Sequence, residues 1–332
     1  MTHEHPSEAS PETACNQLLQ LQTALESVLL GQQQLVRELL TAIVAGGHVL
    51  LEGLPGLGKT HLAKGLANAL GVSLGRVQCT PDLMPSDITG SEVLQRDVEG
   101  QVQMVFLQGP IFASLVLVDE INRATPRTQS ALLEAMQENQ VTAGGHRHAL
   151  PRPFWVLATQ NPIELEGTYP LPEAQLDRFL FKVHVPYPDA DAMESILDHA
   201  LDSEPSDRLD RILTAPQVVA LSDWGKRVIV AEPVKRAAVE LVLATQPSRG
   251  KNSVAANHLR YGASPRGLQA IVRAARITAL FAGRAHVAIE DIERVALPAL
   301  RHRVLLKVES ELEGIDADTV LREIVGTWLN AH

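Results

Sequence analysis

Residues 53–60 place glycines, a lysine and a threonine at a spacing that suits phosphate binding. They read Gly-Leu-Pro-Gly-Leu-Gly-Lys-Thr and lie between an apolar run and a helix-like segment. Gly56 and Gly58 allow backbone torsions that a Cβ would hinder, so backbone N–H groups can point at phosphate oxygens. The first turn of the following helix adds positive charge. We expect Lys59 to reach the outer phosphates and the Thr60 hydroxyl to complete the shell of a magnesium ion.

A chance glycine-rich turn is the alternative interpretation of this segment. The full eight-residue match, with a predicted strand before it and a predicted helix after it, makes nucleotide binding the stronger interpretation. The expected nucleotide-binding residues of this segment are Gly53, Leu54, Pro55, Gly56, Leu57, Gly58, Lys59, Thr60 and His61.

Two carboxylates follow the apolar run at residues 115–118. Asp119 and Glu120 are thereby placed at the carboxyl end of a predicted strand, where parallel α/β sheets bind their ligands. We expect Asp119 to hold the magnesium ion and Glu120 to polarise the water that attacks the γ-phosphate. A solvated acidic pair is the alternative, and the phosphate loop makes it the weaker one. Arg123 and Arg127 follow closely and suit either contacts between subunits or a salt bridge at the start of a helix.

A second predicted strand, at residues 154–158, also ends in polar side chains, Gln160 and Asn161. An amide at this position could hydrogen-bond the attacking water or the γ-phosphate. The alternative is an ordinary Asn-Pro turn. Because a neighbouring predicted strand already carries the carboxylates, we favour a functional role for Asn161.

The composition is that of an ordinary globular protein: 45% of the 332 residues are hydrophobic and 20% are charged. The net charge of −10 argues against a general binder of nucleic acid or anionic membranes. Cys15 and Cys79 lie too far apart for a CxxC motif and predict neither a disulfide framework nor a zinc site. No segment resembles a membrane span or a signal peptide, so we expect a cytoplasmic protein.

Apolar patterns divide the chain into an α/β part and a helical part. Strands are expected at residues 48–51, 76–79, 115–118, 154–158 and 180–185, with hairpins over 92–107 and 140–150. Helices alone are expected later, at 190–201, 216–228, 233–245, 265–281, 289–303 and 318–329. We therefore expect a disordered lead-in over residues 1–14, a P-loop αβα core with a parallel sheet over 15–188, and a small all-helical lid over 189–332.

Several segments match one known family closely in their residues. Residues 81–90 (PDLMPSDITG), 117–124 (LVDEINRA), 158–162 (ATQNP) and 171–179 (LPEAQLDRF), with the helix at 129–138, closely resemble the MoxR family of AAA+ ATPases. The resemblance runs from about Leu18 to the C-terminus. It implies an AAA+ core in which the hairpin over 92–107 is the helix-2 insert and the hairpin over 140–150 precedes sensor 1. In this clade such hairpins commonly face a central pore.

The resemblance also implies roles for single residues. Asn161 resembles sensor 1, and Arg178 resembles the arginine finger that a neighbouring subunit inserts into the site. Arg266 resembles sensor 2 in the helical lid. Gly31 and Gln32 resemble the segment beside the adenine.

Each of these roles has a structural alternative. Arg178 could instead form a surface salt bridge with Asp177 or Glu173. Arg266 could pair between domains without contacting a phosphate, within its own subunit or across an interface. The adenine-side segment could simply end a helix.

The family implies an ATP-driven motor that remodels client proteins during the maturation of complexes, often by assisting cofactor or metal insertion. A finger supplied in trans implies a homo-oligomeric ring, with a hexamer expected, and a von Willebrand factor A domain protein is the usual partner in trans.

Alternatives are a nucleic-acid-dependent motor, a metal-chelatase-type motor subunit and a non-hydrolysing scaffold. The acidic balance weighs against nucleic acid. Intact Lys59, Asp119, Glu120 and Arg178 weigh against an inert scaffold.

Overall fold

The computed structural model describes residues 10–29, 31–54, 56–96, 101–163, 167–194, 197, 209–250 and 253–332. Two compact units make up the chain. The first, here the sheet unit, is Ala24–Ala215, and the second, here the helical unit, combines Met1–Thr23 with Pro216–His332. The chain passes between the units inside helices α1 (Pro11–Glu26) and α8 (Ala215–Arg227).

The bounds expected from the sequence, a lead-in up to residue 14 and a core up to residue 188, stay a prediction. The two compact units of the structure divide after residues 23 and 215. Beyond residue 188 the chain returns to the sheet unit, where the backbone N–H groups of Ile212 and Leu213 both donate to the Ala69 carbonyl at 2.9 Å. Residues 1–9 of the expected lead-in, part of the helix expected over 190–201, and Pro55 lie outside the described residues.

The sheet unit is built on five parallel strands in the order β2-β5-β8-β1-β9. These strands are β1 (Val49–Glu52), β2 (Leu74–Gln78), β5 (Leu115–Asp119), β8 (Trp155–Gln160) and β9 (Phe181–His184). The parallel sheet expected from the apolar runs is confirmed by the strand pairing. Its three central strands, β1, β5 and β8, are nearly continuous buried hydrophobic segments, as is typical of a sheet covered on both faces. Polar residues at the strand ends therefore gather at one edge of the sheet.

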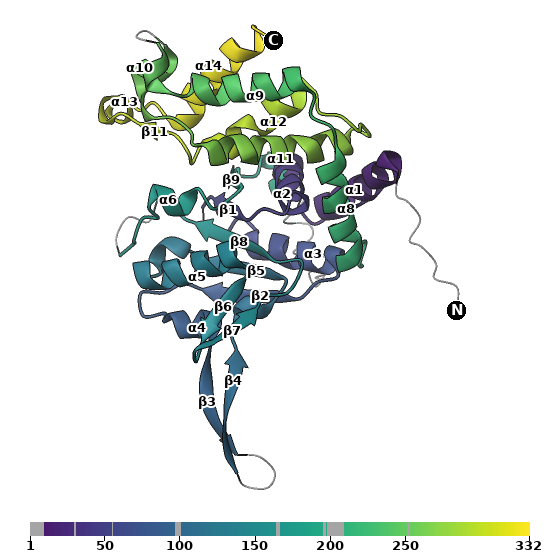
Figure 1. Cartoon of the computed structure of the whole chain (residues 1–332), viewed down its shortest axis with the longest axis vertical. Helices are drawn as coiled ribbons and strands as arrows, with labels where there is room; N and C mark the ends of the chain where they lie inside the picture. Colours follow the sequence, from purple (N-terminus) through teal and green to yellow (C-terminus); the bar gives the residue numbers. More distant parts are fainter. Residues whose placement is uncertain are drawn as a thin grey trace. The chain divides into compact units, whose positions relative to one another are not determined.

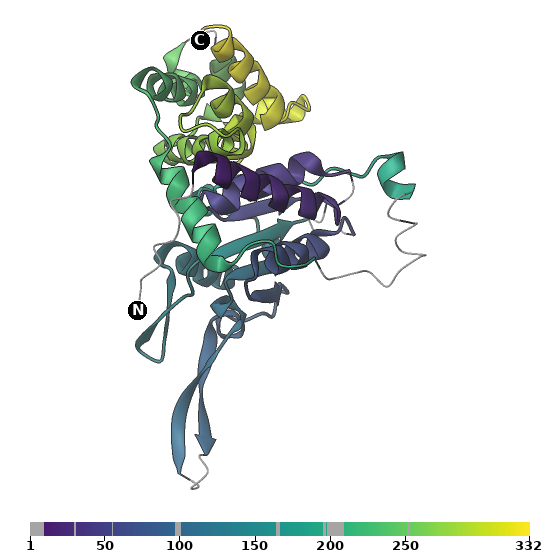
Figure 2. The ribbon, with the colours of Figure 1, turned by 90° about the vertical axis from the view of Figure 1, so that its right-hand side faces the viewer.

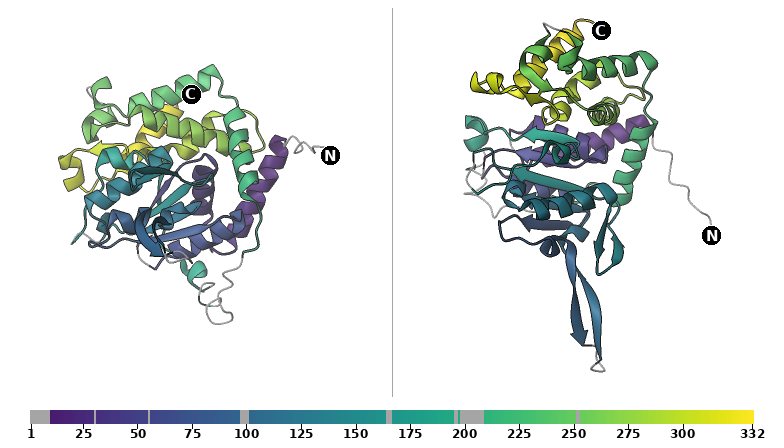
Figure 3. Two further views of the ribbon diagram at one scale, coloured as in Figure 1. Left: turned by 60° about the horizontal axis from the view of Figure 1, so that its bottom comes forward. Right: turned by 60° about the vertical axis from the view of Figure 1, so that its left-hand side comes forward.

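Helices cover both faces of this sheet (Figures 1 and 3). Alternate residues of β5 and β8, such as Val116 and Val156, pack on one face with Leu132 and Met136 of α5 (Pro126–Glu138). Helices α2 (Gln33–Val44) and α3 (Lys59–Leu70) contact the sheet as well. Shorter elements are α4 (Pro85–Thr89), α6 (Glu173–Leu176), and the 3-10 helices η1 (Pro110–Phe112) and η2 (Ile121–Arg123).

Two hairpins extend from the sheet unit, and both were expected from the sequence. The longer one joins β3 (Gly90–Arg96) to β4 (Val102–Gln108) and projects well beyond the body of its unit (Figure 2). The shorter one joins β6 (Gln140–Ala143) to β7 (His146–Ala149). The imidazole ring of His148 stacks on the Phe106 ring with centroids 4.0 Å apart, so the two hairpins are in contact.

The helical unit contains the expected helices at bounds close to those predicted. They are α9 (Glu232–Ala244), α11 (Pro265–Phe281), α12 (Ile289–Leu300) and α14 (Ala317–Leu329), besides α8. The structure adds α10 (Val254–His258), α13 (Val308–Leu312), η3 (Pro247–Arg249), and an antiparallel ribbon of β10 (Leu259–Tyr261) with β11 (Leu305–Leu306). The expectation of helices alone missed this ribbon because two or three residues are too short to show strand alternation.

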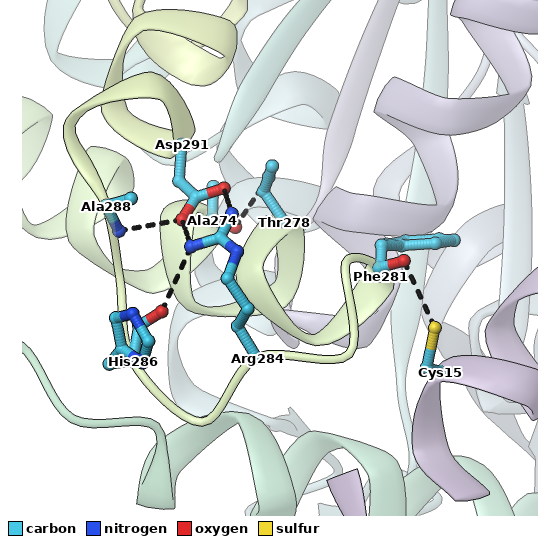
Figure 4. A network of polar contacts seen from close by, with 8 residues as sticks. All are labelled: Cys15, Ala274, Thr278, Phe281, Arg284, His286, Ala288 and Asp291. Carbon is cyan, nitrogen blue, oxygen red and sulfur yellow. Dashed lines mark hydrogen bonds and ion pairs between the residues drawn. The ribbon is translucent and has the colours of Figure 1, made fainter. Parts of the chain in front are cut away.

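A buried ion pair fixes the loop before α12 (Figure 4). Both guanidinium Nη groups of Arg284 donate to Asp291, at 2.8 and 2.7 Å, and the Ala288 N–H donates to the same carboxylate at 2.8 Å. Arg284 also donates to the His286 carbonyl at 3.2 Å. A carboxylate with three donors is well compensated for its burial.

In the described ranges, no helix is both long and apolar enough to cross a membrane.

Candidate functional site

The loop between β1 and α3 has the backbone geometry of a phosphate cradle. Gly56 and Gly58 adopt φ values of +82° and +76°. A Cβ added to Gly56 would meet no atom within 4 Å, so crowding does not exclude a side chain there. Glycine is favoured at this position because of its positive φ. Helix α3 begins at Lys59, and the N–H groups of its first turn have no partner within the helix. These donors are available to an anion.

Lys59 is half-buried at the start of this helix. Its Nζ donates to the Gly53 carbonyl at 2.5 Å, which anchors the side chain along the loop. Burial lowers the pKa of Lys59, while the charges of Asp119, Glu120 and Glu52 act in the opposite direction. The lysine therefore lies in the field of both expected catalytic carboxylates.

The two carboxylates end β5, as expected, and hydrogen bonds hold Glu120 in place. Glu120 has a left-handed backbone, with φ of 55°, and its N–H donates to the Thr159 hydroxyl at 2.9 Å. Its Oε2 accepts hydrogen bonds from Arg123 Nη1 at 3.0 Å and from Gln78 Nε2 at 3.3 Å. A strained, bonded conformation of this kind fixes the direction of a carboxylate. Of the two sequence interpretations of Arg123, the salt bridge is the one seen here.

A cavity of about 380 Å³ brings most of the expected residues together. Its walls are Gly56, Leu57, Gly58, Lys59, Thr60, His61, Arg76, Gln78, Asp119, Glu120, Thr159 and Asn161. Gly53 and Leu54 are not among the lining residues. Gly53 nevertheless supports the loop, because its N–H donates to the Gln160 carbonyl at 3.2 Å and its carbonyl holds Lys59.

The position of Asn161 is compatible with both interpretations of its motif. It lines the cavity, and its Oδ1 accepts the Ile163 N–H at 3.2 Å, which is the bond of a local Asn turn. With Oδ1 engaged in this turn, the amide NH₂ is the part of the side chain suited to contact an anion. Residue 161 can therefore shape the turn and donate to a phosphate at once.

Three of the expected site residues with polar side chains lie outside the cavity lining. Arg178, after α6, is half-buried; within the described ranges its Nε has no acceptor and it forms no ion pair with Asp177 or Glu173. Gln32 is buried, and in the same ranges its Oε1 has no donor. Arg266 is exposed in the first turn of α11, in the helical unit, where its backbone N–H donates to the Ser264 hydroxyl at 3.2 Å.

Gly31, beside Gln32, also has a conformation that favours glycine. Its φ is +73°, and an added Cβ would lie 2.7 Å from the Ala192 Cβ. The preceding turn approaches the phosphate loop, because Leu29 Cδ2 lies 4.0 Å from the position of a Cβ on Gly58.

Sequence reasoning missed three cavity residues, Arg76, Gln78 and Thr159. Arg76 and Gln78 are two apart on β2, which pairs with β5 so that Gln78 lies opposite Asp119. The alternation of polar residues at the end of a predicted strand was visible, but the strand order that brings it beside the carboxylates was not. Arg76 Nε donates to Asp119 Oδ2 at 2.9 Å.

The donor set suits a magnesium ion. The Asp119 carboxylate is largely buried, and both it and Thr60 line the cavity beside the glycine-rich loop. A carboxylate and a hydroxyl are hard oxygen ligands of the type that Mg²⁺ prefers, with nucleotide phosphates and water completing its shell. The described residues hold no group of three or more His, Cys, Asp or Glu side chains placed to bind a metal by themselves.

Comparisons with known proteins agree with this geometry. A family model described as ATPase family associated with various cellular activities (AAA) matches residues 48–181, and an AAA lid domain model matches residues 251–324. A solved structure from Cytophaga hutchinsonii, described as a candidate ATPase, has a TM-score of 0.87 at 38% identity, covering 96% of this chain and 95% of that one.

Relatives share most of the chain's length. Chaperone MoxR1 of Mycobacterium tuberculosis is 39% identical, over 91% of this chain and 79% of the relative. Protein MoxR of Paracoccus denitrificans is 34% identical, over 86% and 87%. The uncharacterized protein YeaC of Bacillus subtilis is 42% identical over 91% of each chain. The AAA family match implies nucleotide binding, which agrees with the glycine-rich loop between β1 and α3. Together, these relatives show that the chain belongs to the MoxR family of AAA+ ATPases.

Proposed function

We propose that this protein hydrolyses Mg²⁺-ATP at the interfaces of a homo-oligomeric ring and uses the energy to remodel client proteins. The observation that carries this proposal is one cavity that joins a glycine-rich cradle, Lys59 and Thr60 to the carboxylates Asp119 and Glu120. A relative named Chaperone MoxR1 supports a chaperone role. We extend that role to the maturation of client complexes, including cofactor or metal insertion.

The residues of the cavity divide the chemistry among them. The loop N–H groups and Lys59 hold the phosphates, and Thr60 and Asp119 hold the magnesium ion, which when bound neutralises charge on the β- and γ-phosphates. Glu120 orients and polarises the attacking water, and the hydrogen bonds from Arg123 and Gln78 hold its carboxylate in place. The Asn161 amide donates to the γ-phosphate. Placement and charge neutralisation carry most of the catalysis in this class of reaction.

Arg178 completes the site of a neighbouring subunit. Its guanidinium is half-buried without an ion-pair partner in the described ranges, which is costly unless another charge arrives. A γ-phosphate supplied by a neighbour meets that need, and a finger of this kind is worth roughly 10³–10⁵ in rate. Arg266 acts as the second sensor from the helical unit. A finger that acts in trans requires an assembly of subunits, and the ring that we propose is a hexamer.

The adenine base lies beside Gly31 and Gln32. The buried Gln32 Oε1, which has no donor among the described residues, is matched in chemistry to the exocyclic amino group of adenine. The chain just before Gly31 lies near the start of α3, since Leu29 Cδ2 is 4.0 Å from the position of a Cβ on Gly58. These two residues thus favour ATP over nucleotides without an amino group at that position.

The hairpins β3–β4 and β6–β7 contact the client. Leu94, Val102 and Met104 on the longer hairpin are more than half exposed, which is unusual for apolar side chains on a projecting ribbon. We place the motor in the cytoplasm, with a von Willebrand factor A domain protein as its partner in trans and no role for nucleic acid.

Glu120→Gln tests the assignment directly. The variant is expected to bind ATP like the wild type and to hydrolyse it about 10²–10⁴ times more slowly, because the base is lost but the cradle remains. Lys59→Ala, in contrast, should lose nucleotide binding. Calorimetric binding and steady-state phosphate release distinguish the two, and unchanged turnover in Glu120→Gln contradicts the role of the glutamate.

Mixing two inactive variants tests the shared interface. Arg178→Ala keeps its own cradle and glutamate, whereas Glu120→Gln keeps its finger. Mixed rings should therefore contain some complete sites and recover part of the activity that each variant lacks alone. Absence of recovery, with mixed assembly confirmed by mass measurement, counts against a finger in trans.

A further inference from the structure

Arg76 lines the same cavity as Lys59 but comes from β2, on the other side of the carboxylates. Its Nε donates to Asp119 Oδ2 at 2.9 Å. The Arg76 side chain is 55% exposed, whereas that of Asp119 is only 11% exposed. A guanidinium that faces solvent thus neutralises a carboxylate that does not. Nothing in the proposed hydrolysis uses this arginine.

The sheet places Arg76 there for a geometric reason. β2 is one of the two edge strands of the sheet, and its parallel register with β5 sets Gln78 opposite Asp119. Because side chains alternate along a strand, Arg76 and Gln78 share one side. Gln78 Oε1 accepts from Arg76 Nη2 at 3.5 Å, and Gln78 Nε2 donates to Glu120 Oε2 at 3.3 Å. The edge strand therefore presents an arginine to the aspartate and an amide to the glutamate.

A largely buried carboxylate needs a positive partner. Lys59 contributes through its charge, but its Nζ is in hydrogen-bond contact with the Gly53 carbonyl. In the described part of the chain, Arg76 is the cation in direct contact with Asp119. A magnesium ion would take oxygen ligands, and the Asp119 carboxylate would supply one of them. Because the Arg76 guanidinium already contacts Oδ2 of that carboxylate, it would compete with the ion for the same group.

We propose that Arg76 is a built-in competitor of the metal at Asp119, so that tight Mg²⁺ binding depends on the nucleotide. This proposal rests on the proposed function of the same site. A metal ion arriving alone must displace the guanidinium and gains one protein carboxylate in return. A metal ion arriving with a triphosphate brings its other ligands with it and displaces the arginine more readily. Once released, Arg76 returns to water at little cost, because its side chain is already more than half exposed.

Arg76→Ala tests the competition through metal affinity rather than through turnover. Mn²⁺ is the probe, and its binding to the full-length protein without nucleotide is followed by electron paramagnetic resonance. We expect the dissociation constant for Mn²⁺ to fall about 3- to 10-fold, because a charge-assisted contact at Asp119 is removed. The Mg²⁺ concentration that half-saturates binding of a non-hydrolysable ATP analogue should fall by a similar factor.

Two further variants sharpen the result. Arg76→Lys keeps the charge but loses the guanidinium Nε, so we expect an intermediate Mn²⁺ affinity. Arg147→Ala removes one exposed positive charge from β7, outside the cavity lining, and should leave Mn²⁺ affinity unchanged. Equal gains in Arg76→Ala and Arg147→Ala mean that net charge alone is responsible, and this outcome overturns the proposal.

The remaining outcomes separate failure of this inference from failure of the proposed function. Unchanged or weaker Mn²⁺ binding in Arg76→Ala overturns the competition. So does an equal loss of analogue affinity with and without Mg²⁺, since that result makes Arg76 a phosphate ligand instead. If the wild-type protein binds no analogue at any Mg²⁺ concentration, the proposed function itself fails.

Discussion

Asp119 in the sheet unit and Asp291 in the helical unit are both buried carboxylates paired with an arginine, yet their surroundings differ. Asp291 is 1% exposed and accepts three hydrogen bonds, two from Arg284 and one from the Ala288 N–H (Figure 4). Among the described residues, the Asp119 carboxylate accepts one hydrogen bond, from Arg76 Nε. The Asp291 carboxylate is therefore fully hydrogen-bonded within its own unit, whereas the Asp119 carboxylate can still accept another ligand.

The same two residue types, an aspartate and an arginine, thus form a fixed structural pair in one unit and an easily broken pair in the other. A bidentate pair with a backbone donor is a fixed structural element, because breaking it leaves a buried charge. A single bond from a solvent-facing arginine neutralises a carboxylate while leaving the pair easy to break. The number of hydrogen bonds that each carboxylate accepts, rather than its burial alone, distinguishes the structural aspartate from the functional one.

Asp119→Asn is expected to have the largest effect on activity. The substitution keeps the shape of the side chain but removes the charge that holds the metal, and we expect kcat to fall about 10³-fold. The free energy of unfolding should change by less than about 1 kcal/mol, since the lost contact is a single partly exposed ion pair. Steady-state ATPase assays and urea titration measure the two quantities. A large loss of stability with little loss of kcat reverses the assignment.

Asp291→Ala is expected to show the opposite pattern. Arg284 loses both of its charged hydrogen bonds and α12 loses its N-terminal cap, which together should cost about 3–5 kcal/mol of unfolding free energy. Urea titration of the intact chain measures this loss. The double variant Arg284→Met/Asp291→Ala should be less destabilised than the sum of the single variants, because it leaves no charge unpaired. Strict additivity contradicts a saturated pair.

Glu52 is a third carboxylate and is intermediate between the other two. It ends β1 and pairs with Lys182 at 2.8 Å and His184 at 3.1 Å. Burial raises its pKa, but the hydrogen bond from His184 and the charge of Lys182 outweigh burial and bring the pKa to about 2. The partners come from β9, so the interaction joins two neighbouring strands just before the phosphate loop.

Because the folded state lowers the pKa of Glu52, its stabilisation is complete above the ordinary value of 4.5 and is lost as the pH falls toward 2. We expect the difference in unfolding free energy between wild type and Glu52→Gln to shrink by about 2–3 kcal/mol from pH 6 to pH 2. Urea titrations at several pH values measure it. His184 and Lys182 are present in both proteins, so a difference that does not vary with pH contradicts the lowered pKa.

The sequence predicted what depends on short-range pattern. The phosphate loop, the carboxylates after β5 and both hairpins could be located because glycine spacing, apolar runs and turn residues are local signals. It did not predict Arg76 or Gln78, since their role depends on β2 pairing with β5, which are far apart in sequence. The ribbon of β10 and β11 and the return of residues 212–213 to α3 also depend on long-range contacts.

The smallest expected effect is the coupling between Arg76 and Asp119 in the absence of nucleotide and metal. A double-mutant cycle of Arg76→Ala and Asp119→Asn, measured by urea titration with a chelator present, should give less than about 1 kcal/mol. The matched cycle of Arg284→Ala and Asp291→Asn should give a clearly larger coupling, since two charged hydrogen bonds in a buried setting are lost together. Equal couplings in the two cycles contradict the distinction between a releasable and a fixed pair. A metal ligand requires a weak coupling of this kind. The free energy of the Arg76–Asp119 contact is lost when the metal binds, so a stronger contact would weaken metal binding by the same amount.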